Sequence, residues 1–310
     1  MTDRRKFFAA ASAAALAPAA FAQEKAAAPA PVMPWPRAIN PILFSCKYTM
    51  TKGRSLEERF QSVKDAGYDG IDFDDCGPVT AEQVRSAAWN TGLFVHNAIN
   101  HTHWGKRFTS ANEADAEIAA KNLDHCLRVS HAAGGSGVLL VVGAKGDGPI
   151  EVLEQRCRER ISKHLPLAAA LGQRILFENV WNGMHYTDKG PGDQGVDDFV
   201  KFIDSFKSPW IGSYFDIGNH HRYAHVGAWI RKLDYRIAKL DLKGYDKKKA
   251  LESGNNGQWR DIVDGDIDWA DVRAALKEIN FHGWSTAEVG GGDTKRLAKV
   301  LGDMKKALLG

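Results

Sequence analysis

The chain has 310 residues, 44% of them hydrophobic and 25% charged, which is enough apolar material for a large buried core. Its formal net charge is +3, and it falls to +1 once Asp3, Arg4, Arg5 and Lys6 of an expected leader are removed. A nearly neutral chain gives no electrostatic reason to expect nucleic acid as a partner.

The first 22 residues are predicted to be an export signal rather than part of the fold. Arg4 and Arg5 precede an Ala-rich apolar stretch over residues 7–17, and residues 20–22 offer a small-x-small cleavage site. The paired arginines resemble a twin-arginine signal, which predicts that the protein is exported to the periplasm in a folded state. The alternative is an uncleaved membrane anchor, but the apolar stretch is shorter than the ~20 residues that a bilayer requires.

Residues 23–36 are rich in alanine and proline and have no apolar period, so they are predicted to form a linker. The segment 37–310 has room for one large α/β barrel or two small domains, and nothing in it suggests contact with a membrane. Its cysteines lie far apart and without metal-binding spacing, so we expect buried thiols, although export leaves a disulfide open. These cysteines are Cys46, Cys76, Cys126 and Cys157.

Eight helices are predicted from capping residues and from apolar residues at helical spacing. Ser55 and Glu58 predict a capping box before the first helix, which ends at Gly67. Thr80 with Gln83 begins the second helix. The other six are expected near residues 113–133, 150–171, 196–206, 222–233, 268–279 and 293–308.

Short apolar runs of strand length lie between these helices. They cover residues 41–45, 70–74, 93–97, 137–142, 174–178, 212–216, 237–242 and 284–289. Strands that alternate with helices pair in parallel, and a closed (β/α)8 TIM barrel in a single domain is the commonest solution at this length. An open doubly wound sheet is the alternative, but no G-x-G-x-x-G motif follows the first run.

The last four predicted strands end on acidic residues, which are Glu178, Asp216, Asp241 and Glu288. In a barrel, these strand ends meet at one mouth, where the active site lies. Any one of these acids alone is as readily a helix cap or a surface ion pair, but four carboxylates packed together repel one another unless a cation or protons neutralise them. An all-oxygen set suits Mg²⁺ or Mn²⁺ better than zinc, so one divalent metal ion is the predicted cofactor.

The motifs around these acids resemble the sugar phosphate isomerase/epimerase superfamily of xylose isomerase-like barrels. The resemblance is carried by FENV at 177–180, YFDIGN at 214–219, KLDLKGYD at 239–246 and the segment 265–289. It implies a metal held by Glu, Asp, His and Glu from successive strands, which map onto Glu178, Asp216, Asp241 and Glu288. Asp241 departs from the family pattern because histidine is common there, and the added anionic ligand is expected to bind Mg²⁺, Mn²⁺ or Ca²⁺ more tightly.

The same resemblance implies an isomerase or epimerase that removes a proton next to a sugar carbonyl and passes through an enediolate. Glu178 and Glu288 are the implied acid and base in addition to being ligands. Return of the proton to the neighbouring carbon gives isomerisation, and return to the other face of the same carbon gives epimerisation. Loss of a β-substituent gives elimination, so a lyase or dehydratase acting on keto-sugars or 3-keto-glycosides is the alternative.

Polar and aromatic residues that follow the predicted strands are expected to line the pocket and bind the sugar. Singly, each histidine is more readily a structural residue, and the spacing of His101 and His103 equally suits extra zinc ligands. The predicted substrate-binding residues are His96, His101, His103, Trp104, Trp181, His185, Asn219, His220, Lys243 and Arg260.

Three glycines at 290–292 precede the last predicted helix, at a position where barrels often bind phosphate through backbone N–H groups. A glycine run alone is weak support for such a site. An exported enzyme rarely meets phosphosugars, so a neutral or oxidised sugar is the favoured substrate, and a homo-oligomer is compatible with the sequence.

Two rival functions remain open on the same scaffold. A metal-dependent endonuclease of the apurinic-site barrel type requires a histidine-rich zinc cluster and a basic groove. A non-catalytic sugar-binding protein keeps the aromatic pocket and has no use for proton-transfer groups.

Overall fold

The computed structural model describes residues 42–73, 79–187 and 189–310. The predicted export signal (1–22) and linker (23–36) lie outside these residues, so the domain boundaries stay a prediction. Within the described ranges, no helix combines the length and the apolar character needed to cross a bilayer.

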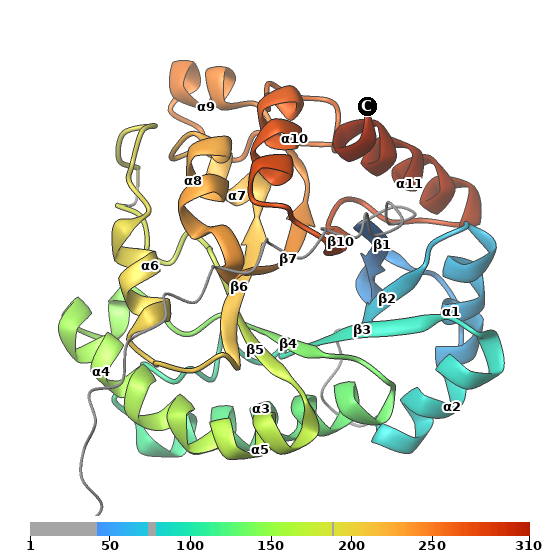
Figure 1. Ribbon diagram of the computed structural model, residues 1–310, viewed down its shortest axis with the longest axis horizontal. Coiled ribbons are helices and arrows are strands. Elements are labelled where there is room, and N and C mark those ends of the chain that lie inside the picture. The colour runs from blue at the N-terminus through green and yellow to red at the C-terminus, as the bar shows by residue number, and fades with distance from the viewer. Residues whose placement is uncertain (1–41, 74–78, 188) are drawn as a thin grey trace, which may run out of the picture. The chain divides into compact units, whose positions relative to one another are not determined.

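Eight parallel strands close into a barrel in the order β1-β10-β7-β6-β5-β4-β3-β2, which confirms the predicted TIM barrel (Figure 1). All eight coincide with the apolar runs of the sequence to within a few residues. Their bounds are β1 (Ile42–Lys47), β2 (Gly70–Phe73), β3 (Phe94–Ile99), β4 (Gly137–Leu140), β5 (Arg174–Glu178), β6 (Ile211–Asp216), β7 (Ile237–Leu242) and β10 (Gly283–Ala287).

The main helices lie around the outside of the strands, and the last one contacts the first, so the outer layer closes as the barrel does (Figure 1). They are α1 (Leu56–Asp65), α2 (Ala81–Thr91), α3 (Glu113–Ala132), α4 (Ile150–Ile161), α5 (Leu165–Leu171), α6 (Asp197–Asp204), α8 (Val226–Leu233), α10 (Trp269–Glu278) and α11 (Thr294–Leu309). Short 3₁₀ turns cover Tyr48–Met50, Lys145–Asp147, Ser162–His164 and Asp234–Arg236.

The two predicted helix starts are present, but only one has the full capping box. At α2, the Thr80 side chain accepts the backbone N–H of Gln83 while the Gln83 side chain accepts that of Thr80. At α1, Ser55 caps Glu58, but the Glu58 carboxylate turns to the backbone and guanidinium of Arg54. The capping box predicted for Ser55 is therefore wrong in its second half, because a charged partner lies one residue further back.

The helix predicted over 150–171 is divided into α4 and α5. Pro166 lies in the first turn of α5, where its missing N–H costs least, and it cannot continue the preceding helix. The helix predicted over 222–233 likewise begins later, at Val226, because a separate short helix, α7 (Ile217–His221), follows β6 directly.

Three further elements escaped the sequence analysis because they are too short to show a period. Strands β8 (Gly244–Tyr245) and β9 (Trp259–Arg260) pair antiparallel after β7, and helix α9 (Lys247–Ser253) lies between them. This insertion places Trp259 beside the carboxyl ends of the barrel strands.

The interior of the barrel is divided into an apolar side and a polar side. Ile99, Leu139, Leu176 and Tyr214 form an apolar cluster separate from the main core that packs between strands and helices. On the other side, Lys239 and Asp72 form an ion pair and neither is exposed to solvent. The hydroxyl of Tyr214 donates to Asp72 at 2.6 Å and so joins the two sides. Leu176, Tyr214 and Lys239 each lie two residues before an acid of the candidate site on the same strand, and so lie beneath it.

The cysteines in the described residues are buried as thiols, as expected. Cys126 and Cys157 direct their sulfurs at the carbonyls of Ile99 and Val142, each at 3.8 Å, and Cys46 lies inside β1. Cys76 lies outside the described residues.

The glycine run at 290–292 serves packing. A Cβ on Gly291 would lie 1.9 Å from the Met50 carbonyl oxygen, and Gly292 donates its N–H to that oxygen at 3.0 Å. The first turn of α11 is capped by Asp293, whose carboxylate accepts the N–H of Arg296. A phosphate at this helix start would therefore meet a carboxylate already bound there.

We expect Gly291→Ala to lower the free energy of unfolding by about 1–3 kcal/mol, because the added methyl overpacks the turn after β1. Gly302→Ala in α11 is the control, since its Cβ would meet nothing within 4 Å. This change is expected to stabilise the protein by up to about 1 kcal/mol. Urea unfolding followed by circular dichroism measures both, and equal small effects would contradict the packing role of Gly291.

Candidate active site

Four carboxylates meet at the mouth of the barrel, as the sequence predicted. Glu178 ends β5, Asp216 ends β6, Asp241 lies near the end of β7 and Glu288 follows β10. The strand register pairs Asp216 with Asp241 directly. One oxygen from each of the four acids lies within 4.8 Å of the corresponding oxygens of the others.

The donor set fits a hard divalent cation. Oxygen ligands lie about 2.0–2.6 Å from Mg²⁺ or Ca²⁺, so oxygens on opposite sides of one ion are about 4–5 Å apart. The spacing of the four acids agrees with that span. Among the described residues this is the one group with such spacing, and neither His101 nor His103 belongs to it. The extra zinc ligands considered for that pair are therefore not found.

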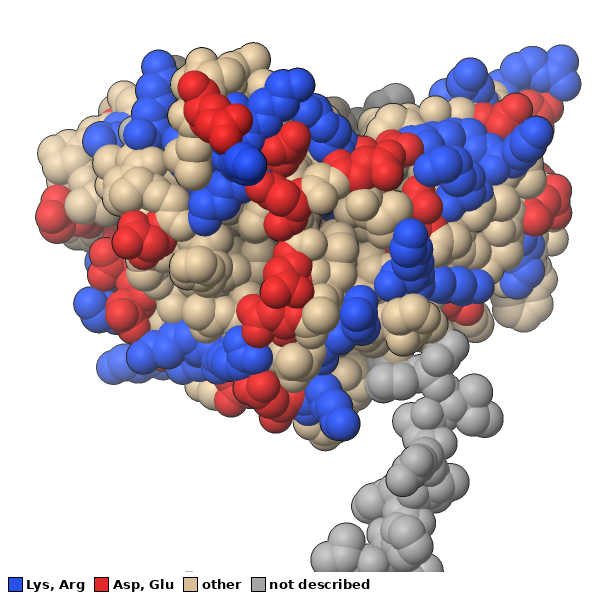
Figure 2. All heavy atoms as spheres, turned by 90° about the horizontal axis from the view of Figure 1, so that it is seen from above, with Lys and Arg blue, Asp and Glu red and all other residues tan. Residues whose placement is uncertain are grey.

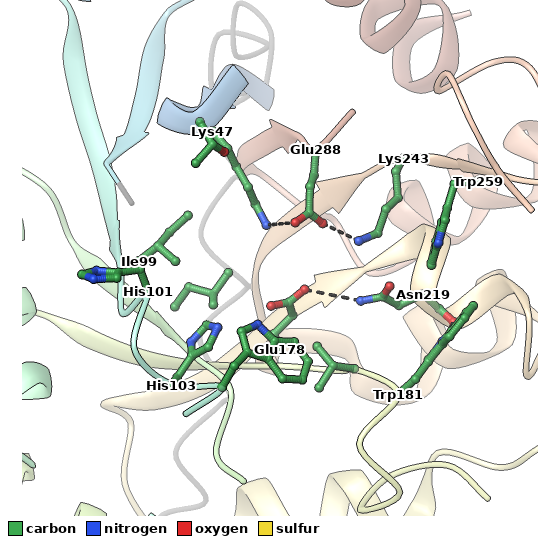
Figure 3. Close-up of a pocket in the computed structure, with 14 residues that line it drawn as sticks. Lys47, Ile99, His101, His103, Glu178, Trp181, Asn219, Lys243, Trp259 and Glu288 are labelled. Carbon is green, nitrogen blue, oxygen red and sulfur yellow. Dashed lines mark hydrogen bonds and ion pairs between the residues drawn. The ribbon is translucent and has the colours of Figure 1, made fainter. Parts of the chain in front are cut away.

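Two lysines contact the same carboxylates (Figure 3). Lys47, at the end of β1, places its Nζ 2.7 Å from Asp241 Oδ2 and 2.7 Å from Glu288 Oε1. Lys243, just after β7, places its Nζ 2.9 Å from Asp216 Oδ2 and also pairs with Glu288 Oε2. The two ammonium groups reach Glu288 from opposite sides, while Glu178 faces them across the cavity.

Burial and the lysines shift the pKa values of these carboxyl groups in different directions. Burial raises the pKa of Glu178 well above its usual range, and the Lys47 ammonium opposes this only in part. Burial likewise raises the pKa of Asp241 to about 8. Burial acts to raise the pKa of Glu288 too, but Lys47 and Lys243 together lower it below its usual value. Glu288 is thus the acid most firmly held as a carboxylate.

Backbone and amide contacts fix Asp216 in place. Its Oδ1 accepts the N–H of Asn219 at 2.7 Å and so caps α7, while its Oδ2 faces Lys243. The side chain of Asn179, directly after β5, holds the same residue. It accepts the Asp216 N–H at 2.8 Å and donates to the Asp216 carbonyl at 2.9 Å. Asn219 in turn donates to the carbonyl of Asn179 at 3.1 Å. The Asp216 carboxylate is therefore both the N-cap of α7 and a candidate metal ligand.

A cavity of about 410 Å³ opens above the carboxylates. Six of the predicted substrate-binding residues line it, namely His101, His103, Trp104, Trp181, Asn219 and Lys243. Lys243 is nevertheless paired with protein carboxylates. The sequence analysis missed Lys47, Thr49, Ile99, Leu139, Val180 and Trp259. Lys47 carried a usable signal, because it ends a buried strand as the four acids do.

Three predicted substrate-binding histidines do not line this cavity. His96 lies beneath it, stacked on Trp284 and in contact with Lys239. His185 packs its ring against Phe199 and Phe202. The structure thus places both imidazoles outside the cavity lining, because their strand and loop positions turn them into the core.

His220 is the third of these histidines, and it is fully buried. Its Nδ1 forms a hydrogen bond with the Tyr186 hydroxyl at 2.8 Å, and its ring packs on Trp229. Two neighbouring residues of α7 therefore have different environments. Asn219 lines the cavity, and His220 is buried in the core.

Arg260 lines a second cavity, of about 530 Å³, that adjoins the first. The two cavities share Lys243, Trp259 and Glu288. Trp259 stacks on Trp181 at 4.9 Å between ring centroids, and the Lys243 ammonium lies 4.9 Å from the Trp259 ring centroid. The residue is still 40% exposed at the boundary between the cavities.

The sequence matches the family described as Xylose isomerase-like TIM barrel over residues 60–305. The chain belongs to this family. No curated protein matches the chain.

Solved structures share the fold at low sequence identity. A D-tagatose 3-epimerase-like protein has a TM-score of 0.69 at 14% identity, over 86% of this chain and 96% of its own. The apo 3-keto-D-glucoside 4-epimerase YcjR from E. coli has a TM-score of 0.69 at 14% identity, over 86% and 99%. The IOLI protein with a bound zinc atom has a TM-score of 0.68 at 11% identity, over 86% and 98%.

We expect acid to destabilise this barrel in part through His185. Burial lowers the pKa of His185 to about 4, below its value of about 6.5 in an unfolded chain. Between these two pKa values the unfolded state binds the extra proton, so stability falls as the pH drops from 7 to 5. His185→Phe removes this loss, worth about 1–2 kcal/mol at pH 5.

The check is the free energy of unfolding of both proteins at pH 7 and pH 5. His282→Phe, at an exposed position before β10, serves as the control for replacing a histidine by phenylalanine. If the parent and His185→Phe lose the same stability on acidification, the imidazole does not contribute.

Proposed function

We propose that the protein is a divalent-metal-dependent sugar isomerase or epimerase that abstracts a proton next to a carbonyl. The observation that carries this proposal is the meeting of four carboxylates from neighbouring strands beneath a cavity with aromatic walls. Membership of the xylose isomerase-like family supports it, as do the sugar epimerases among the structures of the same fold.

The residues that would hold the metal are Glu178, Asp216, Asp241 and Glu288, and Mn²⁺ or Mg²⁺ is the favoured ion. When bound, such an ion supplies a Lewis acid that polarises the carbonyl and the adjacent hydroxyl of a sugar. The mouth of the barrel provides carboxylate oxygens alone for this purpose, which is the chemistry of a hard-cation site.

Glu178 and Glu288 carry the proton in this proposal. Both line the cavity and approach it from opposite sides, so a sugar between them has one carboxylate on each face (Figure 3). One removes the proton from the carbon next to the carbonyl, and the other returns a proton to the opposite face for epimerisation. Return to the neighbouring carbon gives isomerisation.

The walls of the cavity orient the sugar. Trp181 donates its Nε1–H to the Asn219 carbonyl at 2.7 Å, which fixes the indole as an apolar surface. His103 accepts the N–H of Val141 at 3.2 Å through Nδ1, which leaves its Nε2 to meet a hydroxyl. Ile99, Leu139 and Val180 make the floor beside Glu178 apolar and limit the access of water.

Elimination on a glycoside is the second candidate, and the second cavity favours it. A substrate with two units has room for its reacting sugar above the carboxylates and its leaving group beyond Glu288. Trp259 lines both cavities, and its partly exposed indole suits contact with a sugar or an aromatic aglycone.

The carboxylate site disfavours an apurinic-site endonuclease. Acidic and basic side chains are interspersed on the face shown in Figure 2 rather than gathered into a basic groove. Salt-dependent DNA binding would argue against our proposal. We also propose that a twin-arginine signal exports the protein to the periplasm. Its partner there is a small carbohydrate, and the same proposal includes self-association.

The first test is deuterium uptake by a panel of ketoses and 3-keto-glycosides in D₂O. Mn²⁺-loaded protein is expected to exchange the proton next to the carbonyl of its substrate, and EDTA is expected to stop the exchange. Glu178→Gln and Glu288→Gln are expected to slow it by about 10²–10⁴-fold, because each removes a proton-transfer group.

Glu57→Gln on the exposed side of α1 is the control and keeps the exchange rate. Mn²⁺ affinity measured on the same variants separates lost proton transfer from lost metal. Undiminished exchange in Glu288→Gln would remove that residue from the reaction, and binding without exchange by any substrate would indicate a sugar-binding protein.

The second test concerns Trp259. Trp259→Ala is expected to lower kcat/KM for 3-keto-glycosides by about 5–10-fold through a raised KM, since an aromatic contact is worth about 1 kcal/mol. Free ketoses, which do not reach the second cavity, are expected to lose less. Trp89→Ala, in the exposed face of α2, is the control. Equal losses for glycosides and ketoses would contradict a leaving-group role for the second cavity.

A further inference from the structure

The carboxylates at the barrel mouth already have cations of their own. With all four acids ionised, as a bound divalent ion would require, they carry four negative charges, and the ammonium groups of Lys47 and Lys243 supply two positive ones. The remainder is two negative charges in a buried site, which is the charge that one divalent ion neutralises. The balance closes with both lysines and one metal present together.

Both lysines are built into the site. The side chain of Lys47 is 8% exposed and that of Lys243 is 15% exposed. Lys47 Nζ lies 5.9 Å from the ring centroid of Tyr214, and Lys243 Nζ lies 4.9 Å from that of Trp259. These aromatic contacts and the ion pairs fix the ammonium groups among the acids, unlike a lysine in solvent.

The ammonium groups bind the oxygens that a metal needs. Lys47 contacts Asp241 Oδ2, Lys243 contacts Asp216 Oδ2, and the two lysines divide the oxygens of Glu288 between them. Among the described residues, neither lysine forms an ion pair with Glu178, whose carboxylate accepts the Asn219 amide at 3.4 Å. A divalent ion held by this ring would therefore compete with the lysines for the carboxylates of Asp216, Asp241 and Glu288.

We propose that Lys47 and Lys243 are internal counter-cations that hold the four-carboxylate ring together without metal and compete with the metal for it. This inference rests on the proposed metal site and adds the residues that set its affinity. Like charges a few ångströms apart in a buried site repel strongly, so each lysine weakens metal binding. The same lysines remove the repulsion that the acids would feel in the metal-free protein.

The test compares Mn²⁺ binding and thermal stability in the full chain, Lys47→Met and Lys243→Met at pH 8. Each variant is expected to bind one Mn²⁺ per chain at least tenfold more tightly than the parent. The metal-free variants are expected to melt at a lower temperature than the metal-free parent, and saturating Mn²⁺ is expected to close that gap, because the ion takes over the neutralising charge.

Lys47→Gln keeps a hydrogen-bonding amide and is the variant to use if the methionine variants fail to fold. It is expected to show the same gain in Mn²⁺ affinity. Lys52→Met, exposed in the loop between β1 and α1, is the control and changes neither quantity.

Unchanged or weaker Mn²⁺ binding in folded lysine variants overturns the inference. Failure of the parent to bind Mn²⁺, with binding gained in the variants, supports the inference and contradicts metal dependence of the proposed reaction. Absence of binding in all of them overturns both. Loss of deuterium exchange in a variant that binds Mn²⁺ more tightly concerns the reaction alone and leaves the inference standing.

Discussion

Electrostatic repulsion among four acids, three of them buried, is the constraint on which the rest of the site depends. Parallel strands bring their carboxyl ends to one mouth, so any acids placed there are forced together whatever else the chain does. Two lysines, one at the end of β1 and one just after β7, reduce this repulsion. Lys47 lies 2.7 Å from Asp241, and Lys243 lies 2.9 Å from Asp216. Side chains of the chain itself thus neutralise part of the charge that the acids bring to the mouth.

The layer beneath shows the same rule at work. Lys239 and Asp72 are both excluded from solvent, and burial lowers the pKa of Lys239 to about 8 although Asp72 acts to raise it. Tyr214 and His96 complete the hydrogen bonds of this pair. The polar side of the barrel is thus a stack of compensated charges, and the apolar cluster on the other side keeps water from entering between them.

Sequence alone was sufficient for the parts of the molecule that follow local patterns. The eight strands were visible as apolar runs, and Glu178 and Asp216 were visible because a charge ends a buried strand. The same reasoning applied to β1 would have found Lys47, but a lysine at a strand end is ordinarily solvated, so its partner has to be known first. That partner, Asp241, lies far away in the chain.

Histidines were the least predictable residues. Whether His96, His185 and His220 face the cavity or the core depends on aromatic rings from distant segments. The β8–β9 insertion was invisible for a related reason, because two-residue strands carry no period and Trp259 gains its place only by stacking on Trp181. Tertiary packing decides both cases, and the sequence does not encode it locally.

Asp216 gives the site a mechanical linkage. One carboxylate oxygen of Asp216 caps α7, and the other pairs with Lys243 at the mouth of the barrel. A movement of this carboxylate would therefore also move the start of the helix. The carbonyl of Asn219 in that helix holds the indole of Trp181, which stacks on Trp259. The indole pair is therefore connected to the ring of acids through the hydrogen bonds of Asn219 and Asp216.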